Sequence, residues 1–137
     1  MSSILLLMGL TTEICYIYPM VNHSFGIAAM ETLRSCQYFN IYLSEHDVEI
    51  IPHQAPSFAT SSYYLILAQQ VPQDLHVIFN CSTFDHIDSG GLGTLILFHN
   101  NLAHLNQPVT LREIHPKVMK KLKTAHLQQL FHLEELP

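Results

Sequence analysis

From about residue 37 onward, short apolar runs alternate along the chain with segments that carry apolar residues at helical spacing. Residues 38–43 and 48–51 are rich in Tyr, Phe, Ile and Val, and the polar residues 44–47 between them are typical of a turn. These two runs therefore predict a hairpin. Residues 75–79 form a continuous apolar run that is too short for a helix, which predicts a central parallel strand covered on both faces.

Helical spacing occurs in three segments. The first spans residues 58–71, after a capping serine at Ser57 and before Pro72. The second runs from residue 89 to about residue 104, and the third opens at Pro116, where the missing N–H of proline costs nothing. The residues expected to face the core are Tyr63, Tyr64, Leu67, Ala68 and Val71 in the first helix, Leu92, Leu95, Ile96 and Leu102 in the second, and Val118, Met119 and Leu122 in the third.

Two short segments near the C-terminus complete the predicted elements. Residues 109–112 predict another strand, and residues 127–133 predict a short helix that turns into a last edge strand. Strands that alternate with helices after an opening hairpin predict an α/β fold with crossover helices packed on the sheet. We expect one domain over residues 37–137, with a mixed β-sheet of four to five strands and helices packed mainly on one face.

Residues 1–36 are apolar and aromatic but have no readable period. They are consistent with an extra strand and helix, and equally with upstream sequence translated from a start site that is not the natural one. The apolar run of residues 4–10 is far shorter than the roughly 20 residues that a membrane-spanning helix needs, and no Lys or Arg precedes it as in a secretory signal. We therefore expect no direct membrane insertion.

Composition favours a folded chain and adds a charge asymmetry. The 137 residues are 48% apolar, and seven Phe and six Tyr separate the chain from disordered sequences. The net charge is −5, and Arg34 is the only basic residue among residues 1–111. Five basic residues lie within residues 112–137, too small a footprint for phosphates, so we expect no nucleic-acid partner. The lysines of the third helix predict a solvated face: Lys117, Lys120, Lys121 and Lys123.

The spacing of cysteine and histidine argues against disulfide and metal chemistry. Cys15, Cys36 and Cys81 are an odd number at wide spacings, which fits a reducing cytoplasm better than a disulfide framework. None of the ten histidines belongs to an HExxH or paired Cys/His motif, and His99 and His104 would lie on different sides of a helix. We expect a cytoplasmic protein with no metal and no cofactor.

The strongest functional signal lies where the central strand leads into the second helix, at residues 85–95. In open α/β sheets, function usually resides at the carboxyl ends of strands. Ser89 falls at or beside the helix N-cap with Asp88 before it, and because either Asp88 or Ser89 can satisfy the free backbone amides, capping explains one polar residue there. Three glycines at the start of a helix each cost about 0.8–1.0 kcal/mol relative to alanine, so capping does not explain them. Gly90, Gly91 and Gly93 instead remove side chains from the surface around Ser89 and present its hydroxyl.

Known nucleotide-binding and nucleophile motifs do not match this segment. The run of residues 90–94 fits neither the dinucleotide fingerprint GxGxxG nor the P-loop GxxxxGK, and it contains no lysine. A serine hydrolase would need the nucleophile on an elbow such as GxSxG, whereas Ser89 has glycine on one side only. His86 lies before the cap without an evident orienting partner. We expect no catalytic residues, and a small serine hydrolase is the least favoured alternative.

Residues 87–95 resemble the signature of STAS domains, the family of bacterial anti-sigma factor antagonists, in which Asp-Ser-Ser/Gly-Gly-Leu-Gly follows the central strand. The resemblance covers about residues 38–135. It continues through Val109–Leu111, His115–Val118 and Leu127–Phe131, which look like the family's fourth strand, third helix and closing segment. The resemblance implies a STAS-like single domain.

The chain departs from the family's pattern at two positions. The family's usual acidic residue before the first helix is replaced around Ser57, which changes the expected partner surface. The second serine of the common double-serine form is Gly90. Ser89 is therefore the only candidate at the family's phosphorylation position.

The resemblance implies a regulatory protein-binding module in transcription control and not an enzyme. In this family a partner anti-sigma factor, which is also an ATP-using serine kinase, phosphorylates the serine matched by Ser89. The unphosphorylated antagonist binds that partner and releases a sigma factor; a phosphatase is a further candidate partner. A phosphoserine adds about −1.5 to −2 charges, which a helix N-terminus tolerates but which would repel a closely apposed partner. The expected partner-binding residues are Asp88, Gly90, Gly91, Leu92, Thr94 and Leu95.

A second interpretation of the same resemblance stays open. STAS subunits of an ABC-type phospholipid transport system also carry a Thr or Ser followed by two glycines, and they bind the ATPase subunit constitutively. The run Ser89–Gly91 leans toward these transporter subunits, whereas the ending Leu127–Phe131 leans toward the antagonists.

Overall fold

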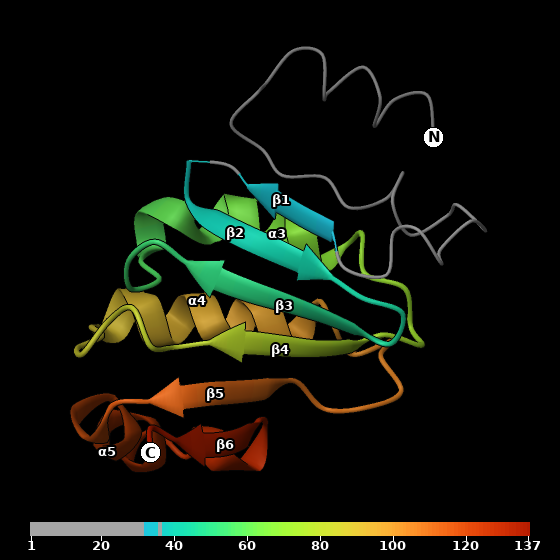
Figure 1. The fold of residues 1–137 in the computed structure, drawn as a ribbon. Helices are drawn as coiled ribbons and strands as arrows, with labels where there is room; N and C mark the ends of the chain where they lie inside the picture. Colours follow the sequence, from blue (N-terminus) through green and yellow to red (C-terminus); the bar gives the residue numbers. More distant parts are fainter. Residues whose placement is uncertain (1–31, 36) are drawn as a thin grey trace.

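The computed structural model describes residues 32–35 and 37–137, and their strands form a single sheet. The strand order β1-β2-β3-β4-β5-β6 follows the chain, so strands adjacent in sequence are adjacent in the sheet (Figure 1). The strands are β1 (Thr32–Ser35), β2 (Phe39–Leu43), β3 (Asp47–Pro52), β4 (His76–Asn80), β5 (Thr110–Ile114) and β6 (His132–Glu135). The helices are η1 (Phe58–Thr60), α3 (Ser61–Ala68), α4 (Ser89–Asn100), α5 (Pro116–Thr124) and η2 (Leu127–Gln129).

Strand direction divides the sheet into two halves. β1, β2 and β3 pair antiparallel, with Ile41 opposite Ile50 in the hairpin. β3, β4, β5 and β6 pair parallel, with Val48 beside Val77 and Phe79 beside Leu111. The predicted hairpin, the central parallel strand and the final helical turn leading into an edge strand are confirmed.

The predicted α/β class is confirmed, and the sheet has one strand more than the four to five expected. The additional strand is β1, whose backbone pairs with β2 at the edge of the sheet. It comes from the segment 1–36, for which no period could be read, because a four-residue edge strand owes its conformation to its partner more than to its own pattern. The rest of that segment, residues 1–31 and 36, lies outside the described residues.

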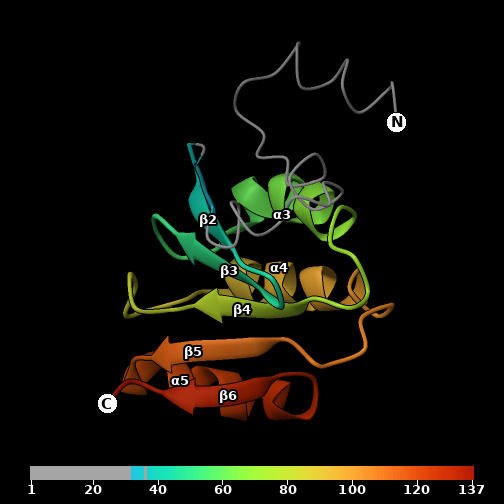
Figure 2. The ribbon, with the colours of Figure 1, turned by 45° about the vertical axis from the view of Figure 1, so that its right-hand side comes forward.

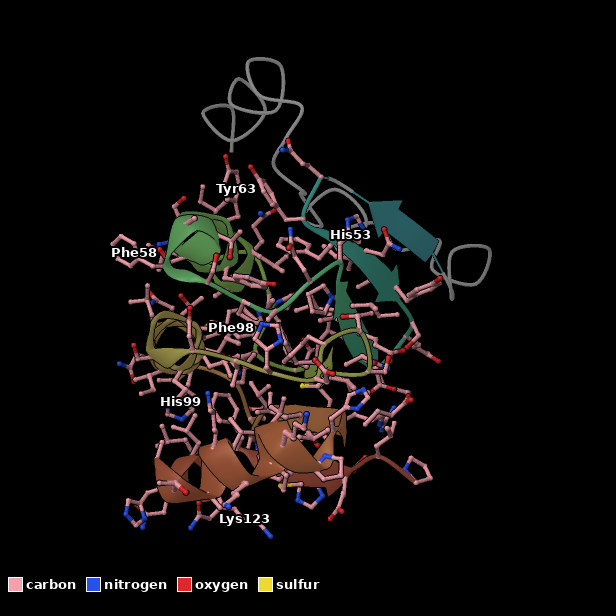
Figure 3. The ribbon with its side chains drawn as sticks, turned by 90° about the vertical axis from the view of Figure 1, so that its left-hand side faces the viewer. His53, Phe58, Tyr63, Phe98, His99 and Lys123 are labelled. Atoms are coloured by element: carbon pink, nitrogen blue, oxygen red, sulfur yellow. The ribbon has the colours of Figure 1, made fainter. Side chains whose placement is uncertain are left out.

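The helices α3, α4 and α5 lie on one side of the sheet, and the core fills the layer between (Figures 2 and 3). Tyr64 of α3 is at the centre of an aromatic cluster, with ring centroids 5.1 Å from Phe39, 5.7 Å from Phe79 and 5.8 Å from Phe98. Such tilted and edge-to-face contacts add to the energy of burying the rings. Because these rings come from β2, α3, β4 and α4, the cluster joins the first helix to the helix that carries Ser89.

The predicted inner face of the second helix is wrong at one position, Ile96, whereas Leu95 and Leu102 are buried and Leu92 packs against the core. The buried positions are Gly91, Thr94, Leu95 and Phe98, whereas Ile96 is 36% exposed. The buried set follows the spacing i, i+3, i+4 and i+7 from Gly91, which places Ile96 on the outside. A glycine was not counted as an inward position in the sequence pattern. The helix also ends at Asn100 instead of about residue 104.

Neighbouring residues of α4 provide a test of this helix orientation. Leu95 is 2% exposed and belongs to the core, so Leu95→Ala should lower the free energy of unfolding by about 2–5 kcal/mol. Ile96→Ala should lower the free energy of unfolding by less than about 1 kcal/mol, because this side chain already lies partly in solvent and leaves no buried cavity. Urea unfolding of both variants measures the difference. Similar losses for the two variants would mean that α4 is rotated from the orientation described.

Candidate functional site

The N-terminus of α4 follows the loop that leaves β4. Asp88 is the N-cap, with an extended backbone, and its Oδ1 accepts a hydrogen bond from the backbone N–H of Gly91 at 2.8 Å. Ser89 is the first helical residue and is exposed. Capping is therefore done by Asp88, and the Ser89 hydroxyl makes no hydrogen bond to another described residue.

The loop before Ser89 is held on both sides by hydrogen bonds. The Lys121 ammonium of α5 donates to the backbone carbonyl of Ile87 at 2.8 Å, and Nε2 of His115 donates to the carbonyl of Ser82 at 3.2 Å. The Thr83 hydroxyl donates to the carbonyl of Pro52 at 2.7 Å. Ile87 itself is buried, so the backbone just before Ser89 is anchored in the core.

Gly91 allows the first turn of α4 to lie directly against the loop that precedes η1. A Cβ atom at this position would overlap the carbonyl oxygen of Pro56 and lie 2.5 Å from Cγ1 of Ile87. Next to this contact, the buried Thr94 hydroxyl lies 2.9 Å from the carbonyl oxygen of Ser57, to which it donates. The two contacts fix the loop and the helix relative to each other.

The three glycines of this turn have different roles. Gly91 serves the packing just described, whereas a Cβ at Gly93 would meet nothing within 4 Å. A Cβ at Gly90 would lie 3.4 Å from Asp88 Oδ1 and from the backbone of Phe58, which is ordinary van der Waals contact. The expectation that the glycines remove side chains from the surface around Ser89 therefore applies to Gly90 and Gly93, and Gly91 has a steric role.

Phe58 is a surface residue that the sequence pattern did not single out. It is the first residue of η1, lies beside Gly90, and is 81% exposed. Figure 3 shows its side chain at the outer side of the helical layer. The pattern assigned residues 58–71 to one helix and counted only its inner positions. An aromatic residue directly after a capping serine, ahead of the first inward position Tyr63, was the available signal.

The predicted partner-binding residues divide by burial. Asp88 and Ser89 are exposed, and Gly90 and Leu92 are partly exposed. Thr94, Leu95 and Gly91 are buried beneath this surface. Their side chains or backbone can support a docking surface from below, but they do not form its outer layer.

A shallow depression of about 290 Å³ separates the loop 54–57 from the loop 83–88. At its edge, Nδ1 of His86 lies 3.3 Å from Oδ1 of Asp85, and this hydrogen bond holds the pKa of Asp85 below its ordinary value, with Lys117 adding a smaller effect. His86 thus has the carboxylate partner that the sequence did not reveal. Neither residue makes a hydrogen bond to Ser89 in the described part of the chain, so no Ser–His pair forms.

Comparison with known proteins identifies the family. A family model for the STAS domain matches residues 45–135. The chain belongs to the STAS domain family. This confirms the resemblance drawn from residues 87–95. A search of curated proteins finds no match.

A solved structure shares the STAS fold of this chain. It is a crystal structure from Thermotoga maritima described as that of a "putative anti-sigma factor antagonist". The two superpose with a TM-score of 0.60 at 14% sequence identity, over 71% of this chain and 86% of the other. At this identity the likeness shows the fold alone.

The described residues of this STAS domain contain no cluster of metal ligands and no membrane-spanning helix. Within residues 32–35 and 37–137, no group of three His, Cys, Asp or Glu side chains could hold a metal ion. None of the described helices is long and apolar enough to cross a membrane.

Burial raises the pKa of the Cys81 thiol well above its ordinary value, so its reactive thiolate form is suppressed.

Two glycines of α4 test the packing of the STAS domain at this turn. Gly91→Ala should lower the free energy of unfolding by about 1–3 kcal/mol or more, because the added methyl overlaps backbone that cannot move away cheaply. Gly93→Ala should raise it by about 0.5–1 kcal/mol, because the new methyl meets open space and restricts the unfolded chain. Thermal and urea unfolding measure both changes. A stabilising Gly91→Ala would contradict the close approach of helix and loop.

Proposed function

We propose that this STAS domain is an anti-sigma factor antagonist, a regulatory protein-binding module that is switched by phosphorylation of Ser89. The kinase is the partner anti-sigma factor, which uses ATP. One observation carries the proposal: Ser89 is an exposed first residue of α4 whose capping role is taken by Asp88. Its hydroxyl can therefore be modified without breaking a contact that the fold needs.

The electrostatics of the helix start support a switch that leaves the fold intact. Free N–H groups and the helix dipole favour negative charge at the first turn of α4, so a phosphate on Ser89 is compatible with the helix. Asp88 already places one carboxylate there. Phosphorylation adds about −1.5 to −2 charges to this spot, which changes the field that a docking partner meets.

The proposed docking surface surrounds Ser89 and includes Asp88, Gly90, Leu92 and Phe58. Gly90 lets a partner backbone approach the helix, and Leu92 lies on the same side of α4 as Ser89, one turn further on. Phe58 supplies a large apolar group beside Gly90, of the kind that anchors interfaces in a partner's pocket. Gly91, Thr94 and Leu95 support this surface from below.

The family membership supports this proposal, and so does the printed description of the Thermotoga maritima neighbour. A STAS subunit of an ABC-type phospholipid transport system is the alternative, favoured by the single observation that Gly90 follows Ser89 directly. The two proposals differ in one respect that can be measured. The antagonist responds to charge on Ser89, whereas the transporter subunit binds its ATPase constitutively.

Phosphorylation can be tested directly. The protein is incubated with ATP and candidate anti-sigma factor kinases, and mass spectrometry locates the phosphate. Wild type and Ser62→Ala, a control at an exposed serine of α3, should be modified at Ser89 because its hydroxyl is free and accessible. Ser89→Ala should stay unmodified. A phosphate found elsewhere in all three proteins would contradict the proposal.

The effect of charge on docking is tested with two variants of nearly equal size. Ser89→Asp should weaken binding to the partner kinase by about tenfold or more, while the neutral Ser89→Asn keeps most of the affinity, because only the former adds negative charge. Both variants should unfold at temperatures close to that of wild type. Equal affinities for Asp and Asn would favour the transporter-subunit alternative. Calorimetric titration provides the affinities.

Phe58 can be tested as an anchor of the docking surface. Phe58→Ser should weaken partner binding by about tenfold or more without lowering stability, because the side chain is mostly in solvent and its removal leaves no cavity. Tyr42→Ser is the matched control. Tyr42 is also exposed, at 43%, but it lies on the face of β2 that points away from the core and the helices. If both variants bind as wild type does, Phe58 is not an anchor.

A further inference from the structure

A groove of about 530 Å³ lies between α4 and α5. Leu92 forms the α4 side, and the α5 side is formed by Lys117, Lys120, Lys121, Thr124 and Ala125. The lining is almost wholly apolar, which indicates that the lysines contribute their methylene chains to the walls while their ammonium groups stay at the rim. The result is an open apolar groove edged with positive charge.

The rim charge is unusual for this chain. Four of its six Lys and Arg residues lie on α5, while the net charge of the whole protein is −5. The rim lysines differ in their partners. Lys121 donates to the carbonyl of Ile87, and Lys117 lies close enough to Asp85 to lower its pKa. Lys120 is exposed, and its ammonium group makes no hydrogen bond or ion pair to another described residue, so it offers an unmatched charge beside the groove.

The shape and charge together select the chemistry of an occupant. The nine residues of α5 extend over roughly 13 Å, which matches two to three turns of a docked helix. A helix laid between two helices buries its apolar side in the groove, and acidic residues on its flanks then meet the lysine rim. An apolar floor offers nothing to the phosphates of a nucleic acid.

The groove adjoins the proposed switch. Leu92 lies one turn after Ser89 on the same side of α4, and Lys121 binds the carbonyl two residues before Ser89. A phosphate on Ser89 would therefore stand at the end of the groove. It would carry the same sign of charge as an acidic segment and would attract the same lysines.

We propose that the groove between α4 and α5 binds an acidic amphipathic helix of the partner protein, and that negative charge on Ser89 weakens this binding. The inference rests on the proposed function for the identity of the partner and gives a physical reason for the direction of the switch. The attractive half is apolar contact with Leu92 and Ala125 together with the lysine rim. The repulsive half is the like charge of phosphoserine and the segment's carboxylates.

A synthetic peptide serves as the probe, because it requires no knowledge of the partner. The fluorescein-labelled peptide has about 15 residues, with Leu at positions i, i+3, i+4 and i+7 of successive turns and Glu on its flanks. One comparison peptide carries Lys in place of every Glu, and another has the acidic composition in scrambled order. Fluorescence anisotropy should show that the acidic amphipathic peptide binds wild type about tenfold or more tightly than either comparison peptide. Equal binding of the acidic and basic peptides would overturn the proposal.

Two charge reversals on α5 test where the peptide binds. Lys120→Glu should lower the affinity for the acidic peptide by about tenfold, whereas Lys123→Glu should change that affinity by less than about twofold. Lys123 is exposed on the same helix but does not line the groove, and Figure 3 shows it on the side of α5 away from α4. The two variants have the same net charge as each other, so a general effect of charge would lower both affinities equally. That equal weakening would overturn the assignment of the groove.

The coupling to Ser89 is tested with the same peptide. At low salt, Ser89→Asp should bind the acidic peptide several-fold more weakly than Ser89→Asn does. This difference in affinity should shrink in 0.5 M NaCl, where the Debye length of about 3–5 Å screens the charges. No difference between the two variants would overturn the coupling. The assay uses no kinase, so it fails independently of the proposed function. If Ser89 is phosphorylated but the peptide does not bind, only the groove proposal is wrong. If the peptide binds but Ser89 is not phosphorylated, only the antagonist proposal is wrong.

Discussion

The candidate site depends on how closely the first turn of α4 approaches the backbone of the loop before η1. Gly91 permits the approach, because any side chain there would overlap the carbonyl oxygen of Pro56. The Thr94 hydroxyl bound to the carbonyl of Ser57 adds a directional contact to the steric one. Together they bring Phe58, which starts η1, to the side of Ser89, which starts α4. Two segments that are about 30 residues apart in sequence therefore present one continuous surface.

The segments on both sides of Ser89 are held in place by contacts that do not involve the Ser89 side chain. Asp88 caps the helix and Ile87 is anchored by the core and by Lys121, so the backbone on the N-terminal side is fixed. On the C-terminal side the core residues of α4 hold the helix to the sheet. Ser89 lies between two fixed segments and contributes to neither. Under the proposed function, a change of charge at Ser89 acts on the approaching partner and breaks no contact that the fold needs.

Much of the fold could be predicted because its elements have strong local signals. The hairpin, the apolar run at residues 75–79 and the Pro116 helix each follow from periodicity or from the chemistry of one residue. β1 and the outward turn of Ile96 could not be predicted. The former depends on pairing with β2, and the latter on Gly91, which holds the inner face of α4 through its lack of a side chain.

The site was only partly accessible from the sequence. Ser89 stood out because the glycines around it are costly in a helix. The sequence left Asp88 and Ser89 as two candidate caps, and the choice between them depends on the backbone conformation at Asp88, which the structure supplies. The nearness of Phe58 to Gly90 and the groove between α4 and α5 arise from tertiary packing of segments distant in sequence. Such surfaces become visible only when the helices are placed.

The sequential strand order has a consequence for how this domain reaches its native state. Because each strand pairs with the one before it, every new strand–helix unit can add to an edge that already exists, without threading between earlier strands. Each parallel pairing closes no more chain than one strand–helix–strand unit, which limits its loop-closure entropy. Every strand after the hairpin thus needs only the strand before it as a pairing partner, and β6 completes the sheet at its edge.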